Sequence, residues 1–180
     1  MFMHNASHSD RTHTHSRHSI REKVLQALYA YELSKEPIVN VVETVLADFK
    51  SQTNDFEFAK RLIIETVQHE EELEKYIKAK VAHWEMDRMA VIDRLLLRMG
   101  ICELMYFPDI PPKVTINEVI EVAKTFSTEQ SGKFVNGVLD AILNELKSNK
   151  LLVKTGRGLI EESSRPVRNK SSNQKTAKRK

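Results

Sequence analysis

Residues 87–106, DRMAVIDRLLLRMGICELMY, carry apolar side chains along their whole length. A helix of this composition is apolar on most sides, so other elements must surround it. The stretch therefore predicts a buried central helix, with Asp87 as its N-cap. Cys102 lies within it, and we expect a buried, inert thiol. As the single cysteine of the chain, it also excludes an internal disulfide and a multi-cysteine zinc site.

The sequence on either side of this stretch repeats its apolar residues with the helical period, and no stretch alternates as a strand does. Five glycines and five prolines in 180 residues also favour long helices over many short strands. The sequence therefore predicts an all-α domain. We expect its other helices to run from Ile20 to before Pro37, over 38–50, from Phe56 to about His83 with a bend at Glu70–Glu72, from Thr115 to Phe126, and from Ser127 to about Leu146.

Two helix starts have capping signals. Asn54 and Asp55 precede the third helix as a break and an N-cap. Thr115 and Glu118 have the spacing of a capping box.

Charge is distributed unevenly along the chain. Residues 20–146 contain 15 basic and 22 acidic side chains, a net charge of −7, whereas residues 147–180 contain 11 basic and two acidic ones, a net charge of +9. An acidic body would repel phosphates, so RNA could bind only at a local basic patch. The same body suits a basic protein partner.

This pattern predicts three regions: a flexible, basic and His-rich arm over 1–18, a helical domain over 19–148 and a disordered basic tail over 149–180. No apolar stretch is long enough to span a bilayer, and the first residues lack the pattern of a secretory signal. We therefore expect a cytoplasmic protein without a membrane contact.

Chemistry-bearing motifs are few. His13, His15 and His18 could chelate a metal, but a mobile arm offers no contacts to fix such ligands, so we expect no metal site. The sequence contains no Gly-rich phosphate loop, no H-E-x-x-H motif and no paired-carboxylate motif. These observations favour a protein that is not an enzyme and needs no cofactor.

Two short segments have the residue types of an RNA site. Arg17, His18 and Arg21 surround the start of the first helix, where phosphates could meet arginine side chains and free backbone amides. The segment Lys133–Gly137, KFVNG, could offer a phosphate contact, a stacking ring and a base-edge contact. The alternative is that Phe134 packs in the core and Gly137 marks a close helix crossing. Spacing alone favours this second interpretation.

Residues 112–140, PKVTINEVIEVAKTFSTEQSGKFVNGVLD, closely resemble the signature of the NusB family. Arg21-Glu22 with residues 26–29, QALY, resemble the family's first helix, and Leu97-Arg98 with Glu103-Leu104 resemble a further segment. The likeness covers about residues 17–146. It implies about seven helices in two packed bundles and no catalysed reaction.

The resemblance also implies a role in ribosomal RNA transcription. Members of the family bind the boxA element of nascent RNA together with NusE, a ribosomal small-subunit protein, and join the elongating RNA polymerase through other Nus factors. The alternative is a non-catalytic interaction module associated with rRNA modification or ribosome assembly, since NusB-like domains also occur fused to an rRNA cytosine methyltransferase. Family members differ in forming monomers or homodimers, so the resemblance leaves that state open.

Carried over residue by residue, the family's RNA contacts fall on Arg17, His18, Arg21, Phe126, Gln130, Lys133 and Phe134. His18 stands where the family often has arginine, and Gln130 where it often has an acidic residue. The partner-binding residues fall on Tyr29, Asp93 and Arg94. We therefore predict a small basic, aromatic surface where the first and last helices meet.

Overall fold

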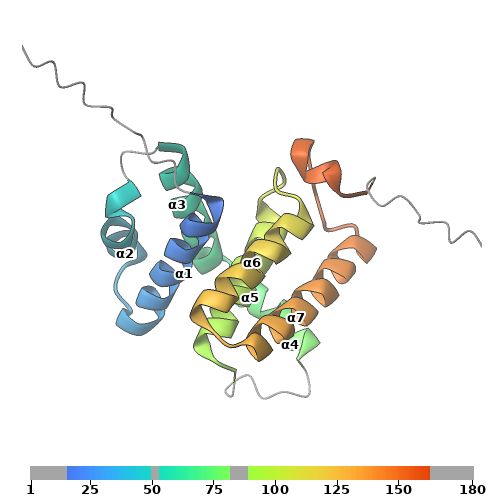
Figure 1. Cartoon of the computed structure of the whole chain (residues 1–180), viewed down its shortest axis with the longest axis horizontal. Helices are drawn as coiled ribbons and strands as arrows, with labels where there is room; N and C mark the ends of the chain where they lie inside the picture. Colours follow the sequence, from blue (N-terminus) through green and yellow to red (C-terminus); the bar gives the residue numbers. More distant parts are fainter. Residues whose placement is uncertain (1–15, 50–52, 82–88, 163–180) are drawn as a thin grey trace, which may run out of the picture.

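A computed structural model describes residues 16–49, 53–81 and 89–162, and every regular element in them is helical (Figure 1). The elements are α1 (Arg17–Ser34), α2 (Ile38–Val45), η1 (Ala47–Phe49), α3 (Thr53–Gln68), α4 (Glu70–Lys80), α5 (Val91–Tyr106), α6 (Pro112–Phe126), α7 (Glu129–Ser148) and η3 (Gly156–Glu162), where η marks a 3-10 helix. The predicted all-α class is confirmed. None of the described helices is long and apolar enough to cross a membrane.

The helices form two bundles, as expected. Helices α1, α2 and α3 pack together, and α4, α5, α6 and α7 form the second group (Figure 1). Helices α1 and α3 of the first group both pack against α5, and α1 also packs against α6. The N-terminal bundle therefore lies directly against α5 and α6, which carry Asp93, Arg94 and Phe126 of the predicted site.

Helix α5 is the central helix that its apolar sequence predicts. Every residue from Leu95 to Leu104 is buried, and burial raises the pKa of the Cys102 thiol to about 12. Gly100 lies at a close approach to α7, because a Cβ at this position would be 3.0 Å from the side chain of Leu139. A Cβ at Gly137 would meet nothing within 4 Å, so the interpretation of Gly137 as a helix-crossing residue is wrong.

Several helix starts differ from the sequence expectation. Helix α6 begins at Pro112, whose missing N–H costs nothing at the first helical position. Thr115 is therefore inside the helix and not an N-cap, and its hydroxyl donates instead to Glu103 Oε1 at 2.6 Å. Helix α3 similarly begins one residue before Asn54. Asp87 lies outside the described residues.

Two other helix ends agree with the sequence. The expected bend near Glu70 is a break at His69, between α3 and α4. Thr128 caps α7, and its side chain accepts a hydrogen bond from the Ser131 N–H at 3.1 Å.

The predicted limits of the flexible ends are corrected by the structure. Helix α1 starts at Arg17, so residues 17 and 18 belong to the helical domain, and residues 1–15 lie outside the described part. Residues 149–162 are not a disordered tail. The Thr155 N–H donates to Pro108 O at 2.9 Å, and η3 packs against α6. These contacts join residues far apart in sequence, so the polar composition of the segment did not reveal them.

Candidate nucleic-acid and partner interface

The first turn of α1 presents two of the predicted RNA-binding residues. Ser16 caps the helix by accepting from the Ser19 N–H at 3.1 Å. Arg17 is exposed, and its guanidinium lies over the ring of Phe58, 4.4 Å from the ring centre. His18 is half-buried between Glu22 and Glu118, at 3.5 and 3.7 Å. Arg17 therefore has a supported side chain that solvent can reach.

Arg21 has a different environment from Arg17. Its side chain is only 2% exposed. Its Nε and Nη2 donate to the two carboxylate oxygens of Glu103, at 2.9 and 2.8 Å, and its Nη1 donates to Arg17 O at 3.0 Å. The pair connects α1 with α5. The prediction that Arg21 itself contacts RNA has no support in this geometry, because all three guanidinium nitrogens already donate to protein oxygens.

A groove of about 460 Å³ lies beside this first turn. Its lining consists of Arg17, Arg21, Asp109, Ile110, Pro111, Val114, Glu118 and Arg157. Arg157 comes from η3, in the segment that the sequence analysis had set aside as a tail. It adds an exposed basic side chain to the groove that contains Arg17. The one feature of the sequence that could have indicated this role is that residues 147–159 include basic but no acidic side chains.

The remaining predicted RNA-binding residues gather at the turn from α6 into α7. Phe126 and Phe134 are half-buried and pack against the core, while Gln130 is exposed. The Lys133 side chain is 73% exposed and pairs with the equally exposed Glu129 at 2.8 Å. Such an exposed pair contributes little energy, so the ammonium group can exchange it for a phosphate. We call Phe126, Gln130, Lys133 and Phe134 the α6–α7 surface.

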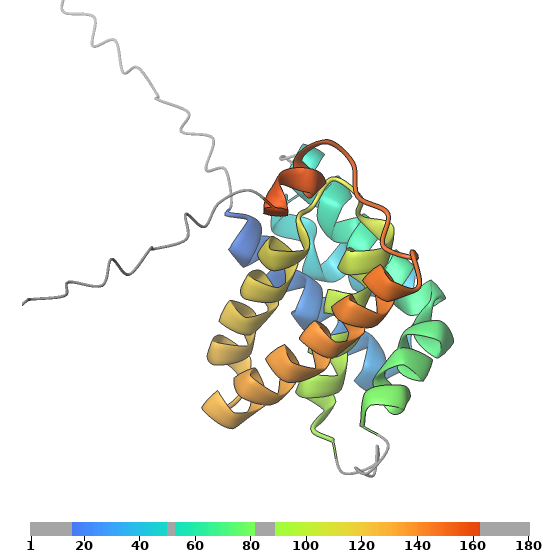
Figure 2. The same cartoon turned by 90° about the vertical axis from the view of Figure 1, so that its right-hand side faces the viewer.

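Arg17 and His18 lie beside one end of α6, and the α6–α7 surface lies at its other end. The predicted RNA contacts therefore do not gather where the first and last helices meet. Helix α6 packs against both α1 and α7 and separates them (Figure 1). Figure 2 shows α6 along one edge of the molecule, with the start of α1 beside its upper part and the turn into α7 at its lower end. Glu118, the neighbour of His18, precedes Phe126 by eight residues, about 12 Å of helix. The predicted single spot is therefore an extended edge.

The predicted partner residues are only partly accessible. Asp93 is buried and accepts a hydrogen bond from Ser127 Oγ at 2.9 Å. Arg94 Nη2 donates to Glu32 Oε1 at 2.8 Å, and these contacts hold α5 against its neighbours. Tyr29 is 39% exposed. It is the one predicted partner residue with a large accessible side chain.

Leu33 is a residue that the sequence analysis missed. It is 64% exposed and lies four residues after Tyr29, on the same face of α1. Leu33 is on the side of α1 away from the buried stripe that includes Val24 and Leu28, and Tyr29 is at the margin of that stripe. An apolar residue outside the buried stripe of an amphipathic helix was the signal that could have identified it.

Comparison with known proteins agrees with this fold. The NusB family model matches residues 18–144. Transcription antitermination protein NusB of Chloroherpeton thalassium is 46% identical over 151 residues, which cover 81% of this chain and 70% of that protein. The protein of the same name from Salinibacter ruber is 45% identical over 148 residues, covering 81% of this chain and 91% of its own length.

Solved structures give the same result. NusB of T. maritima has a TM-score of 0.68 and 35% identity, covering 73% of this chain and 93% of its own. A crystal structure of antitermination factors NusB and NusE in complex with double-stranded RNA contains a chain with a TM-score of 0.65 and 29% identity, covering 72% of this chain and 96% of its own. The family match spans well over half of the residues, and the chain belongs to the NusB family.

Proposed function

We propose that this chain is a transcription antitermination factor that binds boxA-type single-stranded RNA in nascent rRNA transcripts together with NusE. It acts in the cytoplasm by joining the elongating RNA polymerase through other Nus factors, and it catalyses no reaction. Membership of the NusB family and the likeness to a chain solved with NusE and RNA support the proposal.

The observation that carries the RNA assignment is the α6–α7 surface. It places an exposed lysine and an exposed amide beside two half-buried aromatic rings at the end of one helix and the start of the next. A single-stranded RNA needs these partners: cations for phosphates, ring faces for unpaired bases and amides for base edges. Arg17, at the other end of the same edge, supplies a second phosphate contact.

Replacing Arg17 or Lys133 by glutamine is expected to weaken boxA RNA binding about threefold to tenfold at low salt. Each change removes one phosphate contact, so the slope of log K against log salt should become shallower by about 0.7. Replacing Phe126 by leucine keeps apolar volume in the core but removes a stacking face, at a cost of about 1–3 kcal/mol per stacked base. The measurement is a fluorescence-anisotropy titration at two salt concentrations, with and without NusE.

Lys35→Gln is the matched control, because Lys35 is an exposed lysine at the far end of α1. It should leave boxA affinity within twofold of the wild type. Equal affinity for boxA and a scrambled RNA, even with NusE present, would contradict the antitermination assignment. It would leave an interaction module without sequence preference, of the kind associated with rRNA modification or ribosome assembly.

Replacing Tyr29 and Leu33 by serine is expected to reduce NusE affinity about tenfold or more, because exposed apolar side chains at an interface centre carry much of the binding energy. RNA affinity without NusE should change little. Isothermal titration with purified NusE measures the effect, and Val39→Ser provides a control at another exposed apolar position. Unchanged NusE affinity in the double variant would place the partner on a different face.

A further inference from the structure

The C-terminal segment, residues 149–162, folds back over the connection between α5 and α6. Its Thr155 N–H donates to Pro108 O at 2.9 Å, and the Lys154 ammonium donates to Phe107 O at 2.9 Å, at the C-terminal end of α5. Gly158 fits because it lacks a side chain: a Cβ there would be 2.1 Å from Pro108 O. The segment is therefore built into the body, although it lies beyond the residues matched by the family model.

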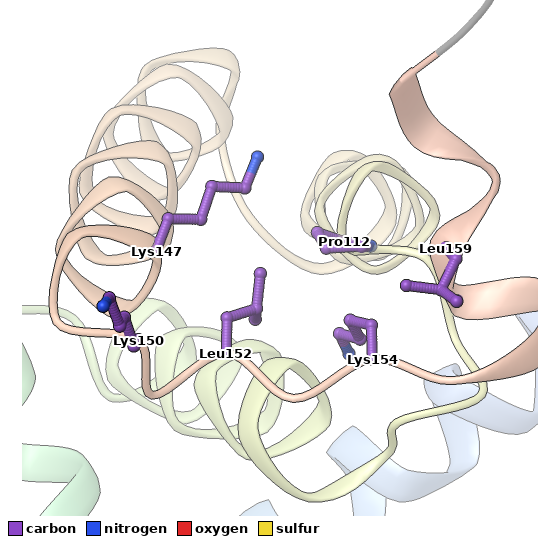
Figure 3. A pocket seen from close by; sticks show the side chains of 7 residues that line it. Pro112, Lys147, Lys150, Leu152, Lys154 and Leu159 are labelled. Carbon is purple, nitrogen blue, oxygen red and sulfur yellow. The ribbon is translucent and has the colours of Figure 1, made fainter.

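A pocket of about 520 Å³ opens between this segment, the start of α6 and the end of α7 (Figure 3). Its lining consists of Pro112, Lys147, Lys150, Leu152, Lys154, Gly158 and Leu159. Three of these residues are lysines, and none of the described lining residues is acidic. Pro112 is the first residue of α6, so the positive end of that helix dipole adds to the same potential.

The three lysines do not have the same role. The Lys154 ammonium donates hydrogen bonds to the backbone carbonyl groups of Glu103 and Phe107 at the end of α5, where a cation stabilises the helix terminus. Lys147 and Lys150 are exposed and form no ion pair with a described carboxylate. Figure 3 shows the Lys147 side chain extending from α7 into the space between α7 and the start of α6. Two ammonium groups are thus available to an anion, on a protein whose residues 20–146 carry a net charge of −7.

This pocket is continuous with the proposed RNA-binding edge. Arg157 lines the groove that contains Arg17, while the next two residues, Gly158 and Leu159, line the lysine pocket. The same short segment therefore forms a wall of both. Leu152 and Leu159 give the pocket apolar surface against which a ribose or a base can pack, next to lysines that suit phosphate.

We propose that the lysine pocket holds backbone phosphates of RNA that extends beyond the boxA-type core. This inference rests on the proposed RNA-binding function and adds a second contact region to it. The RNA backbone follows the basic side chains from Arg17 past Arg157 to Lys147 and Lys150, across a groove that Asp109 and Glu118 also line. The C-terminal segment thereby increases the length of RNA that the protein contacts. It does so without sequence specificity, because phosphate contacts carry no base information.

The experiment compares full-length protein with the double variant Lys147→Gln/Lys150→Gln on two RNAs, a boxA-type core and the same core extended at both ends. For the extended RNA, we expect about tenfold weaker binding at low salt and a salt slope shallower by about 1.4, the value for two lost phosphate contacts. The core RNA should bind to the double variant as tightly as it binds to the wild type. Lys35→Gln/Lys78→Gln removes the same charge from two exposed lysines, one at the C-cap of α1 and one in α4, and should change neither affinity.

Gly158→Ala tests the geometry without changing any charge. The added methyl collides with Pro108 O and displaces the wall of the pocket, so the extended RNA should again bind severalfold more weakly, while far-UV circular dichroism stays unchanged. Equal binding of the extended RNA by wild type and the Lys147/Lys150 variant, with the core RNA still bound, would overturn the inference and leave the proposed function intact. Wild-type protein that binds neither RNA would overturn both. A polyglutamate peptide that loses affinity for the variant, when the extended RNA does not, would identify the pocket as a protein site and also refute the RNA assignment.

Discussion

Replacing Arg21 or Glu103 by alanine is expected to lower the free energy of unfolding by about 3–5 kcal/mol. Both side chains are at most 2% exposed, and the Arg21 guanidinium donates two hydrogen bonds to the Glu103 carboxylate. Removing one partner leaves the other charge buried and unpaired. Thr115 also donates to the Glu103 carboxylate. In Arg21→Ala this neutral hydroxyl would remain as a hydrogen-bond donor, but it cannot balance the charge of the carboxylate.

Urea unfolding followed by circular dichroism measures this effect. The informative control is the double replacement Arg21→Met/Glu103→Leu, which removes both charges and retains apolar volume. It should be less destabilising than either single alanine variant, because no unpaired charge remains. Arg21→Ala with unchanged stability and lost RNA binding would contradict this structural role and would restore Arg21 as a direct RNA contact.

Replacing Arg98 by alanine is the second change with a large expected effect, about 3 kcal/mol of unfolding free energy. Arg98 is buried on α5, and its guanidinium contacts Glu70 at 2.8 Å, Glu32 at 3.6 Å and Glu74. It therefore connects α1 of the first bundle with α4 of the second. Without it, the carboxylates of these three residues would lie close together, and Arg94 would be the remaining described arginine that contacts both Glu32 and Glu74.

The effect of Arg98→Ala should depend on pH. Burial disfavours the ionised form of Glu74, but the hydrogen bond and charge of Arg98, helped by Arg94 and Lys78, outweigh it and hold the Glu74 pKa below its ordinary value of 4.5. A carboxyl group with a lowered pKa stabilises the fold above its unfolded-state pKa, and this contribution is lost as the pH falls through the folded-state value. The difference between wild type and variant should therefore be large at pH 7 and shrink below about pH 4.

Unfolding curves of both proteins between neutral and acid pH measure this dependence. Lys78→Gln serves as the control, because Lys78 is an exposed lysine that also faces Glu74, at 3.5 Å. Its effect on stability should be small at every pH. A constant difference between wild type and Arg98→Ala across the whole range would show that Arg98 stabilises the fold by packing and not through its charge.

Arg98 and Glu103 show why the sequence suggested more about the family than about their roles. Both lie in segments that resemble NusB sequences. The composition of an apolar helix, however, does not predict which residue will pair with a charged side chain inside it. Arg98 pairs with Glu74 of α4, 24 residues away in sequence, and Glu103 pairs with Arg21 of α1, 82 residues away. The same limit affected Arg21, which the sequence placed at the RNA and the structure places in a buried ion pair.

The sequence by itself determined the helices and the buried centre, because apolar periodicity is a local property of the chain. Its signature segment, residues 112–140, indicated the family. The sequence also identified Cys102 as buried and placed the start of the last helix at Ser127, two residues before α7 begins. Only the tertiary structure decided which charged residues face solvent, because burial depends on the neighbours that other helices bring. It separated Arg17 from Arg21, placed the two groups of proposed RNA contacts at different ends of α6, and folded residues 149–162 onto Pro108 through contacts that no local pattern encodes.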